Sequence, residues 1–262
     1  MYKKIILPLI LIIVFLSSII FLIGIKESIK LSVIKEKPII RISDSEVLSS
    51  VKKSDKYTIL MLGDSIGLGF GDESGLDIGN YYKSIQTQYD KENIETVNLA
   101  VNGAKIKDLL NQIQKQEISE LIKHSELIII SIGGNDMKKI LDSSNLNLLI
   151  DYQELAQMYE WNLKEILDNI KNLNSKVKIA MIGLYNPYGE DIPKEKIQIL
   201  INWNHLTRSI IENYSEVAYV GTYDLFKYNL DKYLAIDVFH PNALGYRTIS
   251  SELLLVIDGI EE

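Results

Sequence analysis

The chain has 262 residues, of which 47% are hydrophobic, and it carries a formal net charge of −7 at pH 7. This acidic balance argues against a general nucleic-acid-binding protein, which needs a basic face. The absence of cysteine excludes disulfides, thiolate nucleophiles and cysteine-ligated zinc. Imidazole chemistry must use one of three histidines: His124, His205 or His240.

An uncharged run of residues, 5–25, follows Lys3 and Lys4 at the start of the chain. A helix of this length rises about 30 Å, which is enough to cross the hydrocarbon core of a bilayer. A buried core helix would usually show a polar face, and the apolar part of a cleavable signal peptide is usually only about 7–15 residues long. We therefore predict a transmembrane signal-anchor over 1–25, with a cleaved signal peptide and a secreted protein as the alternative.

The charges on the two sides of this run predict opposite orientations in the membrane. The lysines of the short N-terminal tail suggest that the N-terminus stays in the cytoplasm and that the rest is exported. Five basic residues behind the run oppose this under the positive-inside rule: Lys26, Lys30, Lys35, Lys37 and Arg41. Because the pattern is signal-like, we expect a single-pass protein of the cell membrane with the remainder outside. Residues 26–55, which are charged and weakly patterned, are expected to form a linker or stalk.

Five short apolar runs follow, rich in isoleucine and valine and without strict alternation. Such runs are typical of parallel strands that are buried on both faces of a sheet. They are 57–62, 95–100, 126–133, 177–184 and 217–223.

Segments with helical periodicity lie between these runs. We expect one or two helices in 105–123, a long helix over 151–173, and further helices over 194–214 and 243–257. Asp151 and Glu154 could form a capping box at the start of the long helix. The alternation of strands and helices predicts one three-layer α/β domain over 56–262.

Four short polar stretches fall at the carboxyl ends of the predicted strands, where ligands bind in such sheets. They are Gly63–Gly67 (GDSIG), Asn102–Gly103, Gly133–Asp136 (GGND) and Asp237–Pro241 (DVFHP). Although they are far apart in the sequence, we expect them to meet at one edge of the sheet.

The stretch GDSIG fits the G-x-S-x-G pattern of a nucleophile elbow, although Ser65 alone could equally be an ordinary turn serine. Other glycine-rich motifs fit less well. A dinucleotide fingerprint that began at Gly67 would need glycine at Asp72, and the sequence has no phosphate-binding P-loop motif.

The stretch DVFHP could provide the base that a serine hydroxyl needs. Asp237 and His240 are three residues apart, so the carboxylate could orient the imidazole. The following Asn242 is expected to cap the last helix. In isolation, His240 could also be a loop histidine and Asp237 a cap, whereas His124 and His205 are expected to be structural or surface residues.

Gly103 and Asn135 could stabilise the negative charge that develops on a carbonyl oxygen during acyl transfer. Gly103 has no side chain to obstruct its backbone N–H, and Asn135 offers an amide after two glycines. The backbone N–H of Ser65 could be a third donor. Taken separately, NG and GGND are also good turn sequences.

Together, in this order and at these strand ends, the four stretches resemble the four blocks of the SGNH (GDSL) hydrolase family. The resemblance covers residues from about Tyr57 to Asp258. It implies a flavodoxin-like α/β/α sandwich with a parallel five-stranded sheet. It also implies that Ser65 is the nucleophile, His240 the base and Asp237 its partner. The implied oxyanion donors are the N–H groups of Ser65 and Gly103 and the side chain of Asn135.

Asp64 and Asp136 match family positions as well, and we expect structural roles for them. The chain departs from the family pattern at Ile66 and Gly67, where leucine and often threonine are usual, so substrate contacts near Ser65 are in doubt. The α/β-hydrolases share the order Ser, Asp, His, but their elbow follows several strands. Here only residues 26–56 separate the apolar run from the first strand.

The resemblance implies a carboxylic ester hydrolase that works through an acyl-serine intermediate, without a metal or organic cofactor. The implied substrates are lysophospholipids, simple esters, thioesters, or O-acetylated sugars and cell-wall polymers. A catalytically silent binding module on the same fold is the alternative from another class. We expect the loops 67–80 and 184–196, with Phe70, Tyr185 and Tyr188, to line the pocket.

Overall fold

The computed structural model describes residues 56–88, 93–142 and 148–259. The predicted membrane segment over 5–25 and the stalk lie outside the described residues, so the division into 1–25, 26–55 and 56–262 stays a prediction. Within the described ranges, no helix combines the length and the apolar character that crossing a bilayer requires.

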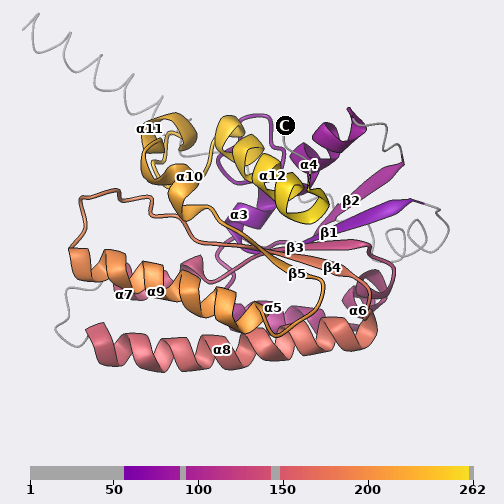
Figure 1. Ribbon diagram of the computed structural model, residues 1–262, viewed down its shortest axis with the longest axis horizontal. Helices are drawn as coiled ribbons and strands as arrows, with labels where there is room; N and C mark the ends of the chain where they lie inside the picture. Colours follow the sequence, from indigo (N-terminus) through magenta and orange to yellow (C-terminus); the bar gives the residue numbers. More distant parts are fainter. Residues whose placement is uncertain (1–55, 89–92, 143–147, 260–262) are drawn as a thin grey trace, which may run out of the picture. The chain divides into compact units, whose positions relative to one another are not determined.

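The centre of the fold is a five-stranded parallel sheet with helices on both faces (Figure 1). Its strands pair in the order β2-β1-β3-β4-β5, which is the flavodoxin-like order. They are β1 (Tyr57–Gly63), β2 (Ile94–Asn98), β3 (Leu127–Ser131), β4 (Lys178–Ile182) and β5 (Val217–Val220). The predicted fold class and all five predicted strands are therefore confirmed.

The continuous apolar runs have the burial that their composition predicts. Every residue of 59–62 in β1 and of 127–130 in β3 is fully buried, because helices cover both faces of these central strands.

Six helices form the two outer layers of the described domain (Figure 1). Helices α4 (Ile78–Thr87) and α12 (Ala243–Asp258) cover one face of the sheet. The other face is covered by α5 (Ile106–Ile113), α6 (Gln116–Lys123), α8 (Leu148–Leu173) and α9 (Lys194–Ile211). Four further helices lie in the segments that follow strands at the carboxyl edge: α3 (Ser65–Leu68), α7 (Gly134–Asp142), α10 (Tyr223–Lys227) and α11 (Leu230–Tyr233).

Helix α8 differs from its prediction at the start. It already includes Leu148, so Asp151 lies inside the first turn and not at the N-cap. The capping box predicted for Asp151 and Glu154 is therefore wrong. The predicted cap of the last helix is confirmed, because the side chain of Asn242 accepts a hydrogen bond from the backbone N–H of Gly245.

Candidate active site

Ser65 is the first residue of α3 and follows β1 through a single residue, Asp64. The side chain of Asp64 caps this short helix, because its Oδ1 accepts a hydrogen bond of 3.0 Å from the backbone N–H of Ile66. Ser131, the last residue of β3, holds Asp64 from the other side. Its Oγ donates to Oδ1 at 3.0 Å, and its carbonyl accepts from the N–H of Asp64 at 2.8 Å.

The turn depends on Gly63, which pairs in register with Ser131. Its φ of 120° is rare for residues with a side chain. A Cβ at this position would lie only 1.9 Å from the carbonyl oxygen of Ser131. The two central strands can therefore approach closely enough to fix Ser65 only because residue 63 is glycine.

Two buried carboxyl groups lie beneath this edge. Burial raises the pKa of Asp64 to about 7, although hydrogen bonds from Ser131 and Ile66 oppose the rise. Burial likewise raises the pKa of Asp136 to about 6, and its Oδ2 accepts from the N–H of Ile106 at the start of α5. Both carboxyl groups thus accept a backbone hydrogen bond in the first turn of a helix, which agrees with the structural roles expected for them.

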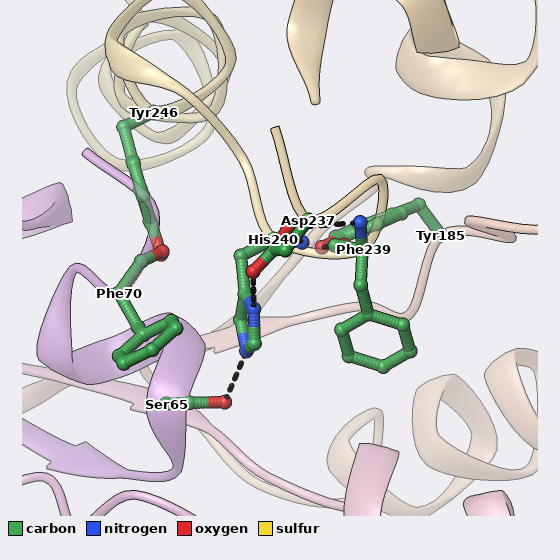
Figure 2. Close-up of polar contacts among 7 residues, drawn as sticks. All are labelled: Ser65, Phe70, Tyr185, Asp237, Phe239, His240 and Tyr246. Atoms are coloured by element: carbon green, nitrogen blue, oxygen red, sulfur yellow. Dashed lines mark hydrogen bonds and ion pairs between the residues drawn. The ribbon is translucent and has the colours of Figure 1, made fainter. Parts of the chain in front are cut away.

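The structure brings Ser65, His240 and Asp237 together in a line (Figure 2). His240 Nε2 lies 2.9 Å from Ser65 Oγ, and His240 Nδ1 lies 2.7 Å from Asp237 Oδ2. With the proton on Nδ1, the imidazole donates to the carboxylate and its Nε2 is free to accept the serine proton. This is the geometry of a nucleophile, a base and an orienting carboxylate.

Asp237 is oriented by the backbone of its own loop. Its Oδ1 accepts hydrogen bonds from the N–H groups of Phe239, at 3.0 Å, and His240, at 2.9 Å. Burial would raise the pKa of Asp237, but the hydrogen bonds from His240 and Phe239 outweigh it and lower that pKa. The carboxyl group is therefore ionised at neutral pH and can stabilise a positively charged imidazole.

Two aromatic rings flank the imidazole of His240. The ring centroid of Phe70 lies 4.6 Å from that of His240, and the ring of Phe239 lies 5.0 Å away at 71°. Each phenylalanine has its carbonyl oxygen held by a buried tyrosine. Tyr246 donates to Phe70 and Tyr185 donates to Phe239, both at 2.7 Å (Figure 2).

Close packing also brings the segment around Phe70 against His240. Gly71 has a φ of 95°, and a Cβ there would lie 2.8 Å from the Cβ of His240. The prediction that the loop 67–80 lines the pocket is wrong, because no residue of this loop lies in the wall of the cavity beside Ser65. The loop packs against the base instead.

The cavity beside Ser65 has a mostly apolar wall. Tyr185, Tyr188 and Pro187 of the predicted loop 184–196 contribute to it, as expected. The remaining apolar lining comes from α3, α7, α9 and the adjoining loops: Ile66, Met137, Leu141, Leu184, Leu200 and Phe239. A substrate group in this cavity would therefore lie against hydrocarbon and aromatic surface.

Asn135 lies in the wall of the same cavity as Ser65. One N–H of its amide donates to the carbonyl of Ala104 at 3.0 Å. This fixes the amide and leaves its second N–H for another acceptor. Within the part of the chain that the structure describes, the backbone N–H of Ser65 has no acceptor either.

Gly103 is exposed and precedes Ala104, the residue that orients Asn135. Its φ is 79°, and a Cβ there would have no atom within 4 Å. Backbone conformation, and not lack of space within the protein, therefore favours glycine here. Gly103 lines a separate hollow with Asn102 and is absent from the wall of the cavity beside Ser65.

The other two histidines lie away from these residues. His124 ends α6 on the way into β3, at the opposite edge of the sheet, and its Nδ1 lies 2.8 Å from the carbonyl of Glu120. His205 is exposed in the middle of α9. Neither could reach the hydroxyl of Ser65.

Comparison with known families agrees with this geometry. The model of the GDSL-like Lipase/Acylhydrolase family matches residues 61–248, which contain all four of the polar stretches. The chain belongs to this family. Its members are carboxylic ester hydrolases of the GDSL (SGNH) type, so the resemblance seen in the sequence is confirmed.

Two relatives are similar to the chain over most of its length. The uncharacterized protein YpmR of Bacillus subtilis (strain 168) is 28% identical over 212 residues, which cover 79% of this chain and 83% of that protein. The spore germination lipase LipC of Bacillus licheniformis is 25% identical over 211 residues, covering 76% of this chain and 94% of LipC.

Solved structures of a lipase and of an acetylxylan esterase share the fold. The lipase Lip_vut3 from a goat rumen metagenome superposes with a TM-score of 0.65 at 22% identity, covering 76% of this chain and 96% of that one. The acetylxylan esterase Axe2 from Geobacillus stearothermophilus superposes with a TM-score of 0.58 at 20% identity, covering 76% of this chain and 92% of that one. At these identities the likeness supports the GDSL fold and not a particular substrate.

Proposed function

We propose that this GDSL-family protein hydrolyses acyl esters through an acyl-enzyme on Ser65. The observation that carries the proposal is the hydrogen-bonded line from Ser65 Oγ through the His240 ring to Asp237, at 2.9 and 2.7 Å, beside an apolar cavity. In this proposal the Ser65 hydroxyl is the nucleophile, the His240 imidazole is the base, and the Asp237 carboxylate orients the imidazole and stabilises its charged form.

In the first half of the reaction, Ser65 Oγ attacks the ester carbonyl while its proton passes to His240 Nε2. Ionised Asp237 stabilises the resulting imidazolium. The tetrahedral intermediate then collapses, the alcohol leaves with the proton from Nε2, and the acyl group remains on Ser65. In the second half, Nε2 takes a proton from water, the hydroxide attacks the acyl carbon, and the carboxylic acid leaves as Ser65 recovers its proton.

The carbonyl oxygen gains negative charge in both halves. The proposal assigns its stabilisation to the backbone N–H of Ser65 and the second amide N–H of Asn135, both of which are fixed before the substrate arrives. The exposed N–H of Gly103 is assigned as the third donor. Its support is its position next to Ala104, the residue that orients Asn135.

The proposed substrates are esters with an aliphatic acyl group, such as a lysophospholipid, a simple ester or a thioester. Support comes from the cavity wall, in which Met137, Leu141 and Leu200 provide apolar surface. LipC, a relative by sequence, is named a lipase. The second candidate is removal of O-acetyl groups from a carbohydrate, which the aromatic rings of Tyr188 and Phe239 at the cavity favour because aromatic faces suit sugar rings.

A panel of soluble esters of increasing acyl length, together with acetylated xylan, separates these candidates. We expect kcat/KM to rise from acetyl to longer chains. The variant Leu141→Trp should lower the rate for long chains more than for acetyl, because it narrows the cavity. Selective hydrolysis of acetyl groups would favour the carbohydrate substrate. A folded protein that neither hydrolyses any ester nor forms an acyl-enzyme would instead be the silent binding module.

The proposal includes anchorage of the chain in the cell membrane through residues 5–25, with the esterase domain outside the cell. Its support is the uncharged length of that run and the signal-like order of charge before it. Protein that stays in the membrane fraction after alkaline extraction would agree with an anchor. Digestion of the domain by protease added to intact protoplasts would agree with export, and complete protection would place it inside.

A further inference from the structure

Exposed apolar side chains are concentrated at one end of the described domain. Among the described residues, seven large hydrophobic side chains are more than half exposed, and six of them lie at the carboxyl edge of the sheet; the seventh, Trp161, lies in the middle of α8. The six side chains at this edge lie in the segments that follow strands β2 and β5 or in the first turn of α8. This edge group consists of Val101, Leu149, Ile150, Tyr228, Ile236 and Val238.

This distribution is unusual because the opposite edge contains loops of the same kind. Among the described residues that connect helices back to strands there, no large hydrophobic side chain is more than half exposed. Single exposed hydrophobic residues are normal on a protein surface, but their concentration at one end indicates an interaction surface. Ser65 and the apolar cavity lie at the same edge, because Ser65 follows the end of β1 through a single residue.

The two residues beside Asp237 are the most informative members of the edge group. Ile236 is 86% exposed and Val238 is 73% exposed, on the loop that carries His240. Val238 also has a φ of 51°, which is strongly disfavoured for a β-branched residue. The other described residues with positive φ and a side chain, Asn93 and Glu216, are polar. Val238 thus combines backbone strain with an apolar side chain that is largely in water, a combination that points to a function.

We propose that this edge docks onto a lipid bilayer, with Ile236 and Val238 inserted among the acyl chains next to the active site. The inference rests on the proposed function and extends it, because it has the enzyme take its ester directly from the lipid surface. Exposed Lys138 in the cavity wall and Lys227, whose ammonium lies 5.1 Å from the ring centre of Tyr228, are suited to lipid phosphates.

The sequence outside the described residues favours a bilayer over another partner. Residues 5–25 form an uncharged run long enough to cross a membrane. The thirty residues 26–55 could reach at most about 100 Å when extended, against a domain of roughly 40 Å. A connection of that reach would leave the carboxyl edge free to face the bilayer, although β1 begins at the opposite edge.

The experiment uses the full chain, which has no cysteine of its own, so a single introduced cysteine reports on one position. Ile236→Cys, Val238→Cys and the matched control Trp161→Cys are each labelled with an environment-sensitive fluorophore. The proteins are reconstituted in phosphatidylcholine–phosphatidylglycerol vesicles, with and without a phosphatidylcholine that carries a spin-label quencher on its acyl chain. Positions 236 and 238 should lose roughly half of their emission to this quencher, and position 161 should lose none.

The absence of lipid quenching at both 236 and 238, in protein that is incorporated and folded, would overturn the proposal. So would shielding of these positions from water without lipid quenching. If the shielding depends on protein concentration, a second copy of the chain covers the edge instead. If it does not, residues 26–55 cover it.

A second variant separates docking from stability. Asparagine tolerates positive φ, so Val238→Asn should raise the melting temperature while it removes the inserted side chain. The rate on an ester embedded in vesicles, divided by the rate on a soluble ester, should fall about tenfold, as for loss of one inserted aliphatic group. An unchanged ratio would contradict docking. If neither ester is hydrolysed, the proposed function fails, but the quenching measurement still decides whether the edge meets lipid.

Discussion

The two sides of the active site are fixed in opposite ways. Ser65, together with Asp64 and Ser131 around it, is at most 5% exposed and is held by hydrogen bonds between the ends of the two central strands. The loop of His240 lies outside the sheet, where the side chain of Asp237 is 38% exposed. This loop is held by hydrogen bonds of its own, including one from the Ala235 N–H to the His240 carbonyl at 2.8 Å, and by the rings of Phe70 and Phe239 against His240.

This contrast predicts whether a substitution on each side changes mainly catalysis or mainly the stability of the fold. The nucleophile side is rigid because backbone hydrogen bonds within a buried sheet are difficult to break locally. The base side depends on hydrogen bonds within one loop outside the sheet and on a few side-chain contacts, each worth about 1 kcal/mol. Substitutions on the base side should therefore change catalysis with little change in stability, whereas those around Asp64 should change stability.

Asp237→Asn should cause the largest loss among these variants. The asparagine amide can donate its N–H to Nδ1 of His240. This hydrogen bond favours the tautomer with the proton on Nε2, so Nε2 can no longer accept the proton of Ser65. In a comparable triad this change cost about 10⁴ in kcat. Steady-state kinetics on a soluble ester measures it, with thermal unfolding as the control for folding. A loss below tenfold would mean that Asp237 does not orient His240.

Asn135→Ala tests the nucleophile side without touching the proton relay. If its free N–H stabilises the oxyanion, kcat should fall by roughly 10²–10³ while KM changes little. The variant Ala104→Gly keeps the carbonyl that orients Asn135 and serves as a control near wild-type activity. A change confined to KM would assign Asn135 to substrate binding.

Asp64→Asn should alter how stability depends on pH. The folded-state pKa of Asp64, about 7, lies above its unfolded value near 3.9, so the folded protein binds the proton more tightly. Its contribution to the free energy of unfolding is therefore present below about pH 4 and is lost as pH rises to about 7. The slope is at most about 1.4 kcal/mol per pH unit.

Asparagine keeps the oxygen that accepts from Ile66 and Ser131 but does not titrate. Urea unfolding of both proteins between pH 4 and 7 should therefore show the variant gaining on the wild type as pH rises. Parallel curves would mean that Asp64 is already ionised throughout this range in the folded protein.

Tyr246→Phe and Tyr185→Phe should have the smallest effects, and these should be specific to catalysis. Each removes one hydrogen bond to a phenylalanine that contacts His240, which should lower kcat several-fold, or about 1 kcal/mol. Tyr159→Phe is the matched control, since Tyr159 is equally buried and its hydroxyl contacts Thr207. With three histidines in the chain, NMR of the imidazole protons can follow His240 directly. An equal loss of activity in the control would indicate a general structural effect.

These contacts also mark the limit of what the sequence could predict. The strands, their order along the chain and the meeting of Ser65 with Asp237 and His240 follow from apolar runs and from short motifs at strand ends. The hydrogen bond from Tyr246 to Phe70 joins residues 176 apart, and that from Tyr185 to Phe239 joins residues 54 apart. Such single long-range contacts leave no periodicity or local motif in a sequence.

The role of Ser131 is not predictable for the same reason. As the last residue of a buried run it gives no sign that its hydroxyl donates to Asp64, 67 residues away. The start of α8 differs from its prediction because Asp151 suits a cap by composition alone. The helix instead already includes Leu149 and Ile150, two apolar residues that a capping pattern does not take into account.

The central claim is that His240 activates Ser65, and reaction with a fluorophosphonate tests it most directly. The wild-type protein should be labelled on Ser65 alone, as identified by mass spectrometry of the peptide that contains LGDSIG. His240→Ala should abolish labelling while the protein stays folded. Equal labelling of Ser65 without His240, or none in the folded wild type, would contradict the account.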